Sequence, residues 1–357
     1  MGRIIIGMSG GVDSAVAAYN LIELGYDVEA IFMKNWEDDS ESCTAAQDYK
    51  DALQVCDKLK IPLHSVNFAK EYWDKVFKYF LEEYKNGRTP NPDILCNTEI
   101  KFKKFLNYAI ELGADKIATG HYVQSINTNG NVQLLKGRDY TKDQSYFLYG
   151  LNQQQISATL FPIGNQIKFN IRKKASQLGF TNFDKKDSVG ICFIGERNIK
   201  DFLKQYLPAN PGVIVTDNGT EIGKHDGLMY YTIGQRKGLG IGGGNSNFNG
   251  AWYVVGKSLE NNELIVAQGH DNPALYHKKI QASELHWISG EPPKTNKLKA
   301  KIRYRGDEIP CEIRNISQDS IKIEFKKLCF GISPGQSVVF YDNQICLGGA
   351  VIDSYHN

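Results

Sequence analysis

The chain has 357 residues, of which 41% are hydrophobic and 23% charged, and its formal net charge is +2. This length favours two or three domains, and the composition is typical of soluble globular proteins rather than disordered or fibrous ones. No run approaches about 18 uninterrupted apolar residues, which excludes a membrane span. Met1 leads directly into the apolar stretch Ile4 to Ile6 without the pattern of a signal or transit peptide, so we expect a cytoplasmic protein.

Cysteine usage argues against a scaffold of disulfides or structural zinc. The chain has seven cysteines, an odd number, and they form neither CxxC pairs nor a zinc-like spacing. Five lie in surroundings that suggest only a structural role: Cys43, Cys56, Cys311, Cys329 and Cys346.

The first 120 residues alternate between strand and helix patterns. Strands are expected at Ile4 to Met8, Val28 to Met33, Leu63 to Phe68 and Lys116 to Thr119, and helices at Ala15 to Leu24 and Ala45 to Leu59. This order predicts an α/β fold with a doubly wound parallel sheet, which binds ligands at the carboxyl ends of its strands. The loops after Met8, Met33 and Thr119 should therefore line the site.

The sequence pattern changes at about Asp201. Glycine-rich turns and short β-prone runs follow, namely Gly212 to Thr216, Ala251 to Val255 and Glu263 to Ala267. Beyond Ile280 the runs Leu298 to Tyr304, Ser320 to Phe325 and Ser337 to Tyr341 suggest a small all-β barrel. We therefore predict a catalytic domain at 1–200, a small central domain at 201–277 and a β-barrel domain at 278–357. Residues 278–327 hold 12 Lys/Arg against 7 Asp/Glu, a local excess of +5 that suits phosphate contacts.

The sequence GMSGGVDS joins the first strand to the first helix. Glycines let backbone N–H groups approach an anion, and the start of a helix adds unpaired donors and a favourable dipole. A plain strand-to-helix turn capped by Asp13 or Ser14 explains the glycines alone about equally well. The complete string SGGVDS is more specific, because it resembles the pyrophosphate loop of the PP-loop ATP pyrophosphatases, which imply attack at the α-phosphate of ATP. The candidate ATP contacts in it are Gly7, Met8, Ser9, Gly10, Gly11, Val12, Asp13 and Ser14.

A second glycine-rich string, GAWYVVGKS at Gly250 to Ser258, imitates a Walker A motif. It has five residues between its glycines where that motif requires four. We therefore interpret Trp252 to Val255 as an ordinary strand.

Two cysteines have surroundings that suggest chemistry. In TPNPDILCN, Asp93 is placed to cap a helix that continues to Leu112, so that Cys96 falls in its first turn, where the dipole would lower the pKa of the thiol. Asp93 is one turn away and could serve as acid or base. Taken alone, the segment is explained more simply by a buried structural cysteine beside a capping aspartate.

Cys192 lies between Ile191 and Phe193 in SVGICFIGER, flanked by two glycines. An isolated cysteine there is ordinarily a small hydrophobe. Together with Cys96 and an ATP site, it suggests sulfur transfer in which one thiol carries a persulfide and the other resolves it.

The motifs GMSGGVDS, IFMKNW, GRTPNPDILCN, TGHY, KDQSYFL, DSVGICFIGER, YTIGQRKGLGI, RYR and PGQSVVFY occur in this order. With them, essentially the full chain resembles the bacterial tRNA-specific 2-thiouridylases, the MnmA family. The resemblance implies a tRNA-uridine 2-sulfurtransferase that uses ATP, with Mg²⁺ expected, to convert uridine 34 of the tRNAs for Lys, Glu and Gln to 2-thiouridine. It also implies a partner that donates persulfide, either a sulfur-relay protein or a cysteine desulfurase.

The same resemblance assigns roles to individual residues. Cys192 would carry the persulfide, Cys96 would attack it, freeing sulfur or leaving a Cys96–Cys192 disulfide, and Asp93 would act as acid or base. Met33 and Gly120 would join the loop around ATP. The residues implied near the target base or the tRNA are Asn91, Pro92, Asp93, His121, Lys142, Asp143, Gln144, Arg303, Tyr304 and Gln336. Taken singly, His121 could be an ordinary loop histidine and Arg303 a surface charge on a strand. The run Lys142, Asp143 and Gln144 could be a solvated turn.

Two other functions fit part of the sequence. A PP-loop synthetase for GMP, NAD or argininosuccinate needs no cysteine pair, and RNA thiolases of the TtcA type would carry CxxC pairs, which are absent. A non-catalytic RNA-binding protein would use the basic β segment and a degenerate ATP fold. Every element of the loop is intact, which favours the enzyme.

Overall fold

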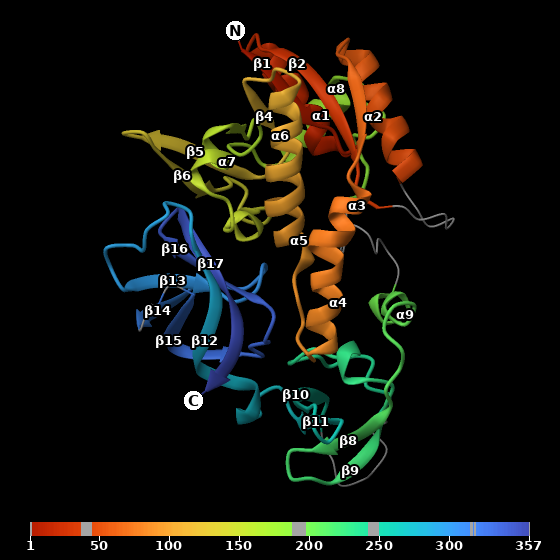
Figure 1. Ribbon diagram of the computed structural model, residues 1–357, viewed down its shortest axis with the longest axis vertical. Coiled ribbons are helices and arrows are strands. Elements are labelled where there is room, and N and C mark those ends of the chain that lie inside the picture. The colour runs from red at the N-terminus through yellow and green to blue at the C-terminus, as the bar shows by residue number, and fades with distance from the viewer. Residues whose placement is uncertain are drawn as a thin grey trace.

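The computed structural model describes residues 2–36, 45–187, 198–241, 250–314, 317 and 319–356. Figure 1 shows a helix-rich part that contains the N-terminus, a small β part at the opposite end, and a β-barrel beside the long central helices. Within these ranges no helix has the length and apolar character needed to cross a bilayer.

The helix-rich part is built on a five-stranded sheet in the order β3-β2-β1-β4-β7, and every pairing in it is parallel. Its strands are β1 (Arg3–Gly7), β2 (Asp27–Lys34), β3 (Leu63–Asn67), β4 (Lys116–Ala118) and β7 (Thr159–Leu160). The predicted α/β class is confirmed, and four of these strands lie where the apolar runs placed them. The short strand β7 was not predicted.

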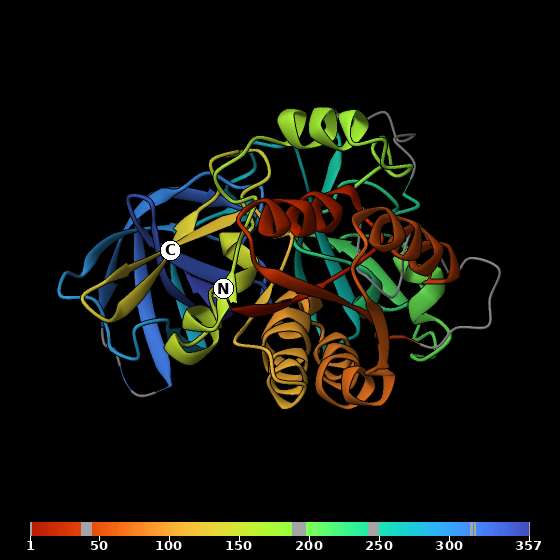
Figure 2. The ribbon, with the colours of Figure 1, turned by 90° about the horizontal axis from the view of Figure 1, so that it is seen from above.

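Alternating side chains of β1 explain why helices cover both faces of this sheet (Figure 2). Ile4 and Ile6 pack with one group of buried side chains, and Ile5 packs with another. The first group includes side chains of α1 (Val12–Glu23), α2 (Ala45–Leu59) and α8 (Lys168–Gln177), and the second includes side chains of α6 (Phe105–Glu111). The doubly wound arrangement is therefore fixed by burial on both faces.

Two long helical stretches run through the middle of the molecule in Figure 1. The first comprises α3 (Ala69–Tyr72), η1 (Trp73–Phe77) and α4 (Lys78–Lys85), and the second comprises α5 (Pro92–Leu95), η2 (Cys96–Lys104) and α6. In both, a π-helical segment interrupts the α-helix, a distortion that is frequent at functional sites. The remaining short helices are η3 (Ser145–Leu148), α7 (Gln153–Ser157), α9 (Ile199–Leu203), η4 (Leu228–Tyr230) and η5 (Pro273–Leu275).

The start of α5 corrects two expectations. Asn91, rather than Asp93, is the N-cap, and its side-chain oxygen accepts a hydrogen bond from the Asp93 backbone N–H at 3.2 Å. Pro92 occupies the first helical position, for which its fixed φ is suited. Cys96 is therefore the fifth helical residue and lies beyond the first turn, where the influence of the helix dipole is weaker.

The C-terminal strands close into a six-stranded barrel in the order β12-β15-β14-β13-β16-β17, because β17 also pairs with β12. These strands are β12 (Tyr276–Trp287), β13 (Lys297–Lys301), β14 (Ile309–Arg314), β15 (Ser320–Phe330), β16 (Ser337–Asp342) and β17 (Ile345–His356). The hairpin β5 (Val123–Thr128) and β6 (Asn131–Lys136) extends this sheet through pairing of β6 with β17. A segment of the predicted N-terminal domain thus belongs to the C-terminal sheet.

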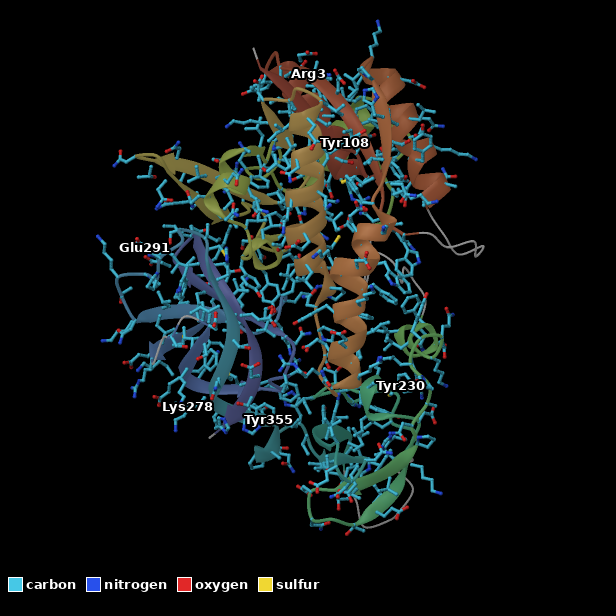
Figure 3. The ribbon with its side chains drawn as sticks, viewed as in Figure 1. Arg3, Tyr108, Tyr230, Lys278, Glu291 and Tyr355 are labelled. Atoms are coloured by element: carbon cyan, nitrogen blue, oxygen red, sulfur yellow. The ribbon has the colours of Figure 1, made fainter. Side chains whose placement is uncertain are left out.

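The small central part is a four-stranded sheet in the order β10-β11-β8-β9. It contains β8 (Gly212–Thr216), β9 (Glu221–His225), β10 (Trp252–Ser258) and β11 (Glu263–Gln268). The interpretation of the Walker-like string as a strand is confirmed, because most of it forms β10. Figure 3 shows Tyr230 of this part far from Arg3, which lies at the other end of the molecule.

Candidate active site

The glycine-rich loop leaves β1 and enters α1 at Gly11, which is the N-cap of that helix without a side-chain cap. The first turn of α1 therefore offers backbone N–H groups to a ligand, as an anion site requires. Ser9 and Ser14 hold the turn together, since Ser14 Oγ accepts from the Ser9 N–H at 3.2 Å and donates to the Gly11 carbonyl at 3.0 Å. Gly10 has φ +75°, which disfavours any other residue.

Two further loops meet this turn, as the parallel sheet predicted. The side chain of Met33, at the end of β2, lies against Gly7, where an added Cβ would be 3.0 Å from Met33 Cε. Gly120, after β4, lies against the start of α1, where a Cβ would be 2.8 Å from the Ser14 nitrogen. Glycine at position 120 thus allows the third loop to approach the first turn of the helix.

Asp13 is the carboxylate of the loop, and two side chains hold it. Lys168 Nζ lies 2.7 and 2.9 Å from its two oxygens, and the Tyr122 hydroxyl donates to Oδ1 at 2.6 Å. Lys168 Nζ also lies 2.7 Å from Asp187. Sequence reasoning did not assign Lys168, which no local pattern marks, nor Asp187 and Tyr122, although these two lie in the quoted motifs DSVGICFIGER and TGHY.

Asp187 gathers three cations from two segments. Lys142 lies 2.6 Å away and Arg172 3.2 Å away, in addition to Lys168. Burial works to raise the pKa of Asp187, but the hydrogen bonds from Lys142 and Lys168 outweigh it and lower the pKa to about 2. The ion pairs therefore connect a predicted tRNA contact, Lys142, to the carboxylate of the loop.

The opposite side of the loop is supported at the Gly10 carbonyl. Asn182 Nδ2 donates to this oxygen at 3.0 Å and Lys185 Nζ at 3.4 Å. Lys185 also pairs with Asp48, at 2.7 Å, and with Asp51, both on α2. Asn182 and Lys185 thus fix the loop through the Gly10 carbonyl.

Cys96 is buried, with 1% of its surface exposed, and belongs to the core that fills the space beside α6. Its neighbour Asn97 donates to the Phe147 carbonyl at 3.4 Å, next to the KDQSYFL motif. Asp93 lies one turn earlier and is partly buried. Cys192 falls outside the described residues.

Two barrel residues named as tRNA contacts lie close to the cysteine segment. Gln336 Nε2 donates to the Thr89 carbonyl at 2.6 Å, two residues before Asn91. The ring of Tyr304 lies 4.4 Å from that of Phe147, measured between centroids. The barrel thus contacts both the GRTPNPDILCN and the KDQSYFL motifs.

Arg303 differs from the expected surface charge on a strand. It follows the end of β13 in a bend, and its Nη2 donates to the carbonyls of Ile233 and Gly331. Burial lowers its pKa below the usual 12.5. Arg303 therefore joins the central part to the barrel, and its contact with tRNA stays a prediction.

The other predicted tRNA contacts differ in how they are placed. His121 is buried, and burial together with the charge of Lys101 lowers its pKa well below 6.5, so that the ring is neutral. The Asp143 carboxylate is also buried and accepts from the backbone N–H groups of Gly137 and Ser145. Gln144 is partly exposed, and its Oε1 accepts from the Tyr122 N–H at 2.9 Å.

Where the structure describes them, the cysteines interpreted as structural are buried, and burial disfavours their thiolate form. Burial raises the pKa of Cys56, Cys311 and Cys329 to about 12. It raises the pKa of Cys346 as well, and that thiol donates to the Ser145 carbonyl at 3.7 Å. Cys43 lies outside the described residues.

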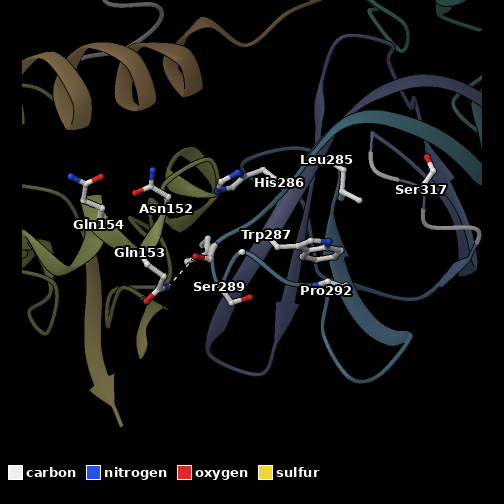
Figure 4. A pocket seen from close by; sticks show the side chains of 11 residues that line it. Asn152, Gln153, Gln154, Leu285, His286, Trp287, Ser289, Pro292 and Ser317 are labelled. Atoms are coloured by element: carbon white, nitrogen blue, oxygen red, sulfur yellow. Dashed lines mark hydrogen bonds between the residues drawn. The ribbon is translucent and has the colours of Figure 1, made fainter. Parts of the chain in front are cut away.

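A cavity of about 560 Å³ lies away from the loop, where α7 meets the end of β12 (Figure 4). Gln153 is one of the residues that line this cavity, and its Nε2 donates to the Ile288 carbonyl at 3.0 Å. Asn152, His286 and Trp287 also line it, but no lysine or arginine does. This lining does not suit a triphosphate, so the loop of β1 remains the candidate nucleotide site.

The central parallel sheet and the SGGVDS turn at the start of α1 define a protein of the PP-loop class. Models of three domain families match the chain: the tRNA methyl transferase HUP domain at residues 2–196, the tRNA methyl transferase PRC-barrel domain at 200–268 and the aminomethyltransferase beta-barrel domain at 277–352. Two curated relatives named tRNA-specific 2-thiouridylase MnmA, from Klebsiella pneumoniae and Salmonella typhimurium, are each 57% identical over 98% of this chain and 96% of their own length. The chain therefore belongs to the tRNA-specific 2-thiouridylase family and is an enzyme.

A solved structure, the U34-tRNA thiolase NcsA from Methanococcus maripaludis, overlaps more distantly. It is 19% identical, with a TM-score of 0.35, over 58% of this chain and 68% of the other. The resemblance inferred from the sequence motifs is confirmed by the relatives that are 57% identical.

Proposed function

We propose that this enzyme uses ATP to convert uridine 34 of the tRNAs for Lys, Glu and Gln to 2-thiouridine. The observation that carries the proposal is 57% identity along the whole chain to relatives named tRNA-specific 2-thiouridylase. The SGGVDS loop on a helix N-terminus and the NPDILCN helix with Cys96 supply the parts that such chemistry needs.

In the first step, uridine O2 attacks the α-phosphorus of ATP, and pyrophosphate leaves. The N–H groups of the first turn of α1 and the hydroxyls of Ser9 and Ser14 bind the departing pyrophosphate. Asp13, the carboxylate of the loop, would help to hold Mg²⁺, which would supply neutralisation of phosphate charge. Adenylation turns O2 into a leaving group.

In the second step, sulfur replaces AMP at C2. Cys192 carries the persulfide, received from a sulfur-relay protein or a cysteine desulfurase, and its terminal sulfur is transferred to C2. The Cys96 thiolate attacks the sulfur of Cys192 and forms a Cys96–Cys192 disulfide, either to free the sulfur before transfer or to release the product afterwards. Asp93, one turn before Cys96, takes or gives the proton.

The target base has to leave the anticodon stack to reach this site. Extrusion costs least in a single-stranded loop. Gln336, which lies against Thr89 just before the cysteine-bearing helix, and Tyr304, which lies against Phe147, are the barrel residues that would meet such a base. Asn91, Pro92 and Asp93 would contact the base itself.

The test is ATP-dependent transfer of sulfur from a persulfide donor to unmodified tRNA. Cys96→Ser and Cys192→Ser should each abolish 2-thiouridine formation. Cys56→Ser should retain it, because Cys56 lies on α2 and is buried in a different core cluster from Cys96. The nucleotide product should be AMP. Full thiolation by Cys192→Ser would refute the persulfide role, and release of ADP would refute adenylation.

A further inference from the structure

Two aromatic side chains stand out on the surface beside the nucleotide loop. Tyr140 and Phe169 are 88% and 71% exposed, the highest values among the large hydrophobic side chains of the described residues. They belong to different segments, but the residues just before them are bonded to each other: the Lys168 N–H donates to Asp139 Oδ2 at 2.9 Å. The two exposed rings therefore belong to adjoining backbone segments, and we call this pair of side chains the aromatic platform.

The backbone beneath Tyr140 is held in a tight turn. Asp139 Oδ1 accepts from the N–H and the hydroxyl of Thr141, at 3.1 and 2.7 Å, and the Lys142 N–H donates to the Asp139 carbonyl at 3.0 Å. The Arg138 N–H donates to the Gly164 carbonyl at 2.9 Å. Because these hydrogen bonds hold the turn, a partner that binds the ring does not have to order the loop.

Cations lie close to both rings along the chain. Arg138 and Lys173 are exposed, and Lys142 is partly exposed. The neighbouring carboxylate of Asp139 is already engaged by Thr141 and Lys168, and Asp187 is engaged by three cations. The groups that this surface exposes are therefore two aromatic rings and positively charged side chains.

Such a surface suits unpaired nucleotides better than a protein or a membrane. Bases stack on exposed aromatic faces, and lysine and arginine contact the phosphates between them. The platform is also continuous with the nucleotide site, because Lys168, which precedes Phe169, binds Asp13 of the loop. An RNA that presents a base to that loop would pass over this surface.

We propose that Tyr140 and Phe169 form a stacking platform for unpaired nucleotides of the RNA substrate. This inference rests on the proposed function and deepens it, since it names a contact with single-stranded RNA that acts through ring faces rather than through phosphate charge.

The test measures binding of a labelled anticodon stem-loop RNA and of single-stranded oligouridine to the full chain by fluorescence anisotropy. Removal of a stacked ring weakens binding by about 5- to 150-fold, so Tyr140→Ala and Phe169→Ala should each weaken it at least fivefold. Tyr140→Trp should retain affinity and Tyr140→Leu should not, because leucine keeps apolar area but has no ring face. Both positions are exposed, so the variants should fold normally, and thermal unfolding checks this.

Matched controls separate stacking from general apolar contact and from charge. Leu24→Ala removes another exposed apolar side chain, 62% exposed at the far end of α1, and should leave RNA affinity unchanged. The slope of affinity against salt should stay the same in Tyr140→Ala, since no phosphate contact is lost, and should fall in Lys173→Met.

Wild-type affinity for both RNAs in the double variant Tyr140→Ala/Phe169→Ala would overturn the platform. A defect confined to binding of the persulfide donor would also overturn it, because the surface would then recognise a protein. The two proposals can fail separately. If the wild-type chain did not thiolate tRNA but Tyr140→Ala still lost oligouridine binding, the platform would stand and the proposed function would fall.

Discussion

The ammonium of Lys168 lies 2.7 Å from the carboxylate of Asp13, although 155 positions separate the two residues in the chain. Lys168 is shared between Asp13 and Asp187, and Asp187 in turn binds Lys142. The carboxylate within the loop is thereby neutralised, which favours approach of a triphosphate.

Lys168→Met is expected to raise the KM for ATP by about tenfold or more. The substitution removes charge-assisted hydrogen bonds of roughly 1.5–3 kcal/mol and leaves Asp13 without its cation. The measurement is the KM for ATP in the thiolation assay, together with the Kd of a nonhydrolysable analogue. Lys174→Met is the matched control, because Lys174 lies on the same helix and bonds to Asn20, at 2.6 Å, rather than to the loop. An equal rise of the KM for ATP in both variants would show that the effect comes from the packing of the helix and not from the ion pair with Asp13.

Gly10→Ala is expected to abolish binding of ATP. A Cβ at position 10 would lie 2.2 Å from the Asp48 carbonyl oxygen, and φ at this residue is +75°. The loop would have to move away from α2. Calorimetric titration with ATP checks the loss.

Gly130→Ala controls for the backbone strain alone. Its φ is +84°, but no atom lies within 4 Å of an added Cβ, so only the cost of about 1 kcal/mol for the left-handed conformation applies. ATP binding should be unchanged in this variant. Normal ATP binding by Gly10→Ala would contradict the prediction.

Arg303→Gln is expected to lower the free energy of unfolding by about 1–3 kcal/mol, because Arg303 supplies hydrogen bonds from the barrel to Ile233 of the central part. Urea unfolding of the full chain measures the shift. Lys299→Gln, an exposed cation on β13, should have little effect. An unchanged urea midpoint in Arg303→Gln would show that these bonds contribute nothing to stability.

Lys257→Met is expected to stabilise the protein at pH 7 by on the order of 1–3 kcal/mol. Burial lowers the pKa of Lys257 to about 8, and its ammonium donates to the Gly87 carbonyl at 2.7 Å. Between pH 10.5 and 8 the unfolded chain binds the proton and the folded chain does not, so this lysine reduces stability as the pH falls through that window. Below pH 8 the reduction stays constant.

Urea unfolding of wild type and Lys257→Met at pH 7 and pH 10 tests this dependence. The difference between the two proteins should be large at pH 7 and smaller at pH 10. Lys224→Met, which changes an exposed lysine of β9, should follow the wild type. A constant difference across this range would refute the lowered pKa.

The sequence by itself determined the local elements of this protein and the identity of its loop. Apolar periodicity placed β1, β2, β3 and α2 to within about a residue, because burial on both faces of a parallel sheet leaves continuous apolar runs. The glycine pattern predicted the anion site, and the φ of +75° at Gly10 is a conformation that favours glycine. At Asp93 the same local reasoning failed, because Asn91 competes for the cap and Pro92 fixes where the helix begins.

Only the tertiary structure decided which distant groups meet. It pairs Lys168 with Asp13, joins β6 to β17, places Gln336 against Thr89 and buries Arg303 between two parts of the molecule. Periodicity and propensity report which face of an element is buried, but they carry no information on what covers that face. Ion pairs and hydrogen bonds between distant segments depend on how the layers pack, and that packing places Lys168 of α8 against Asp13 of the loop and barrel side chains against Thr89 and Phe147.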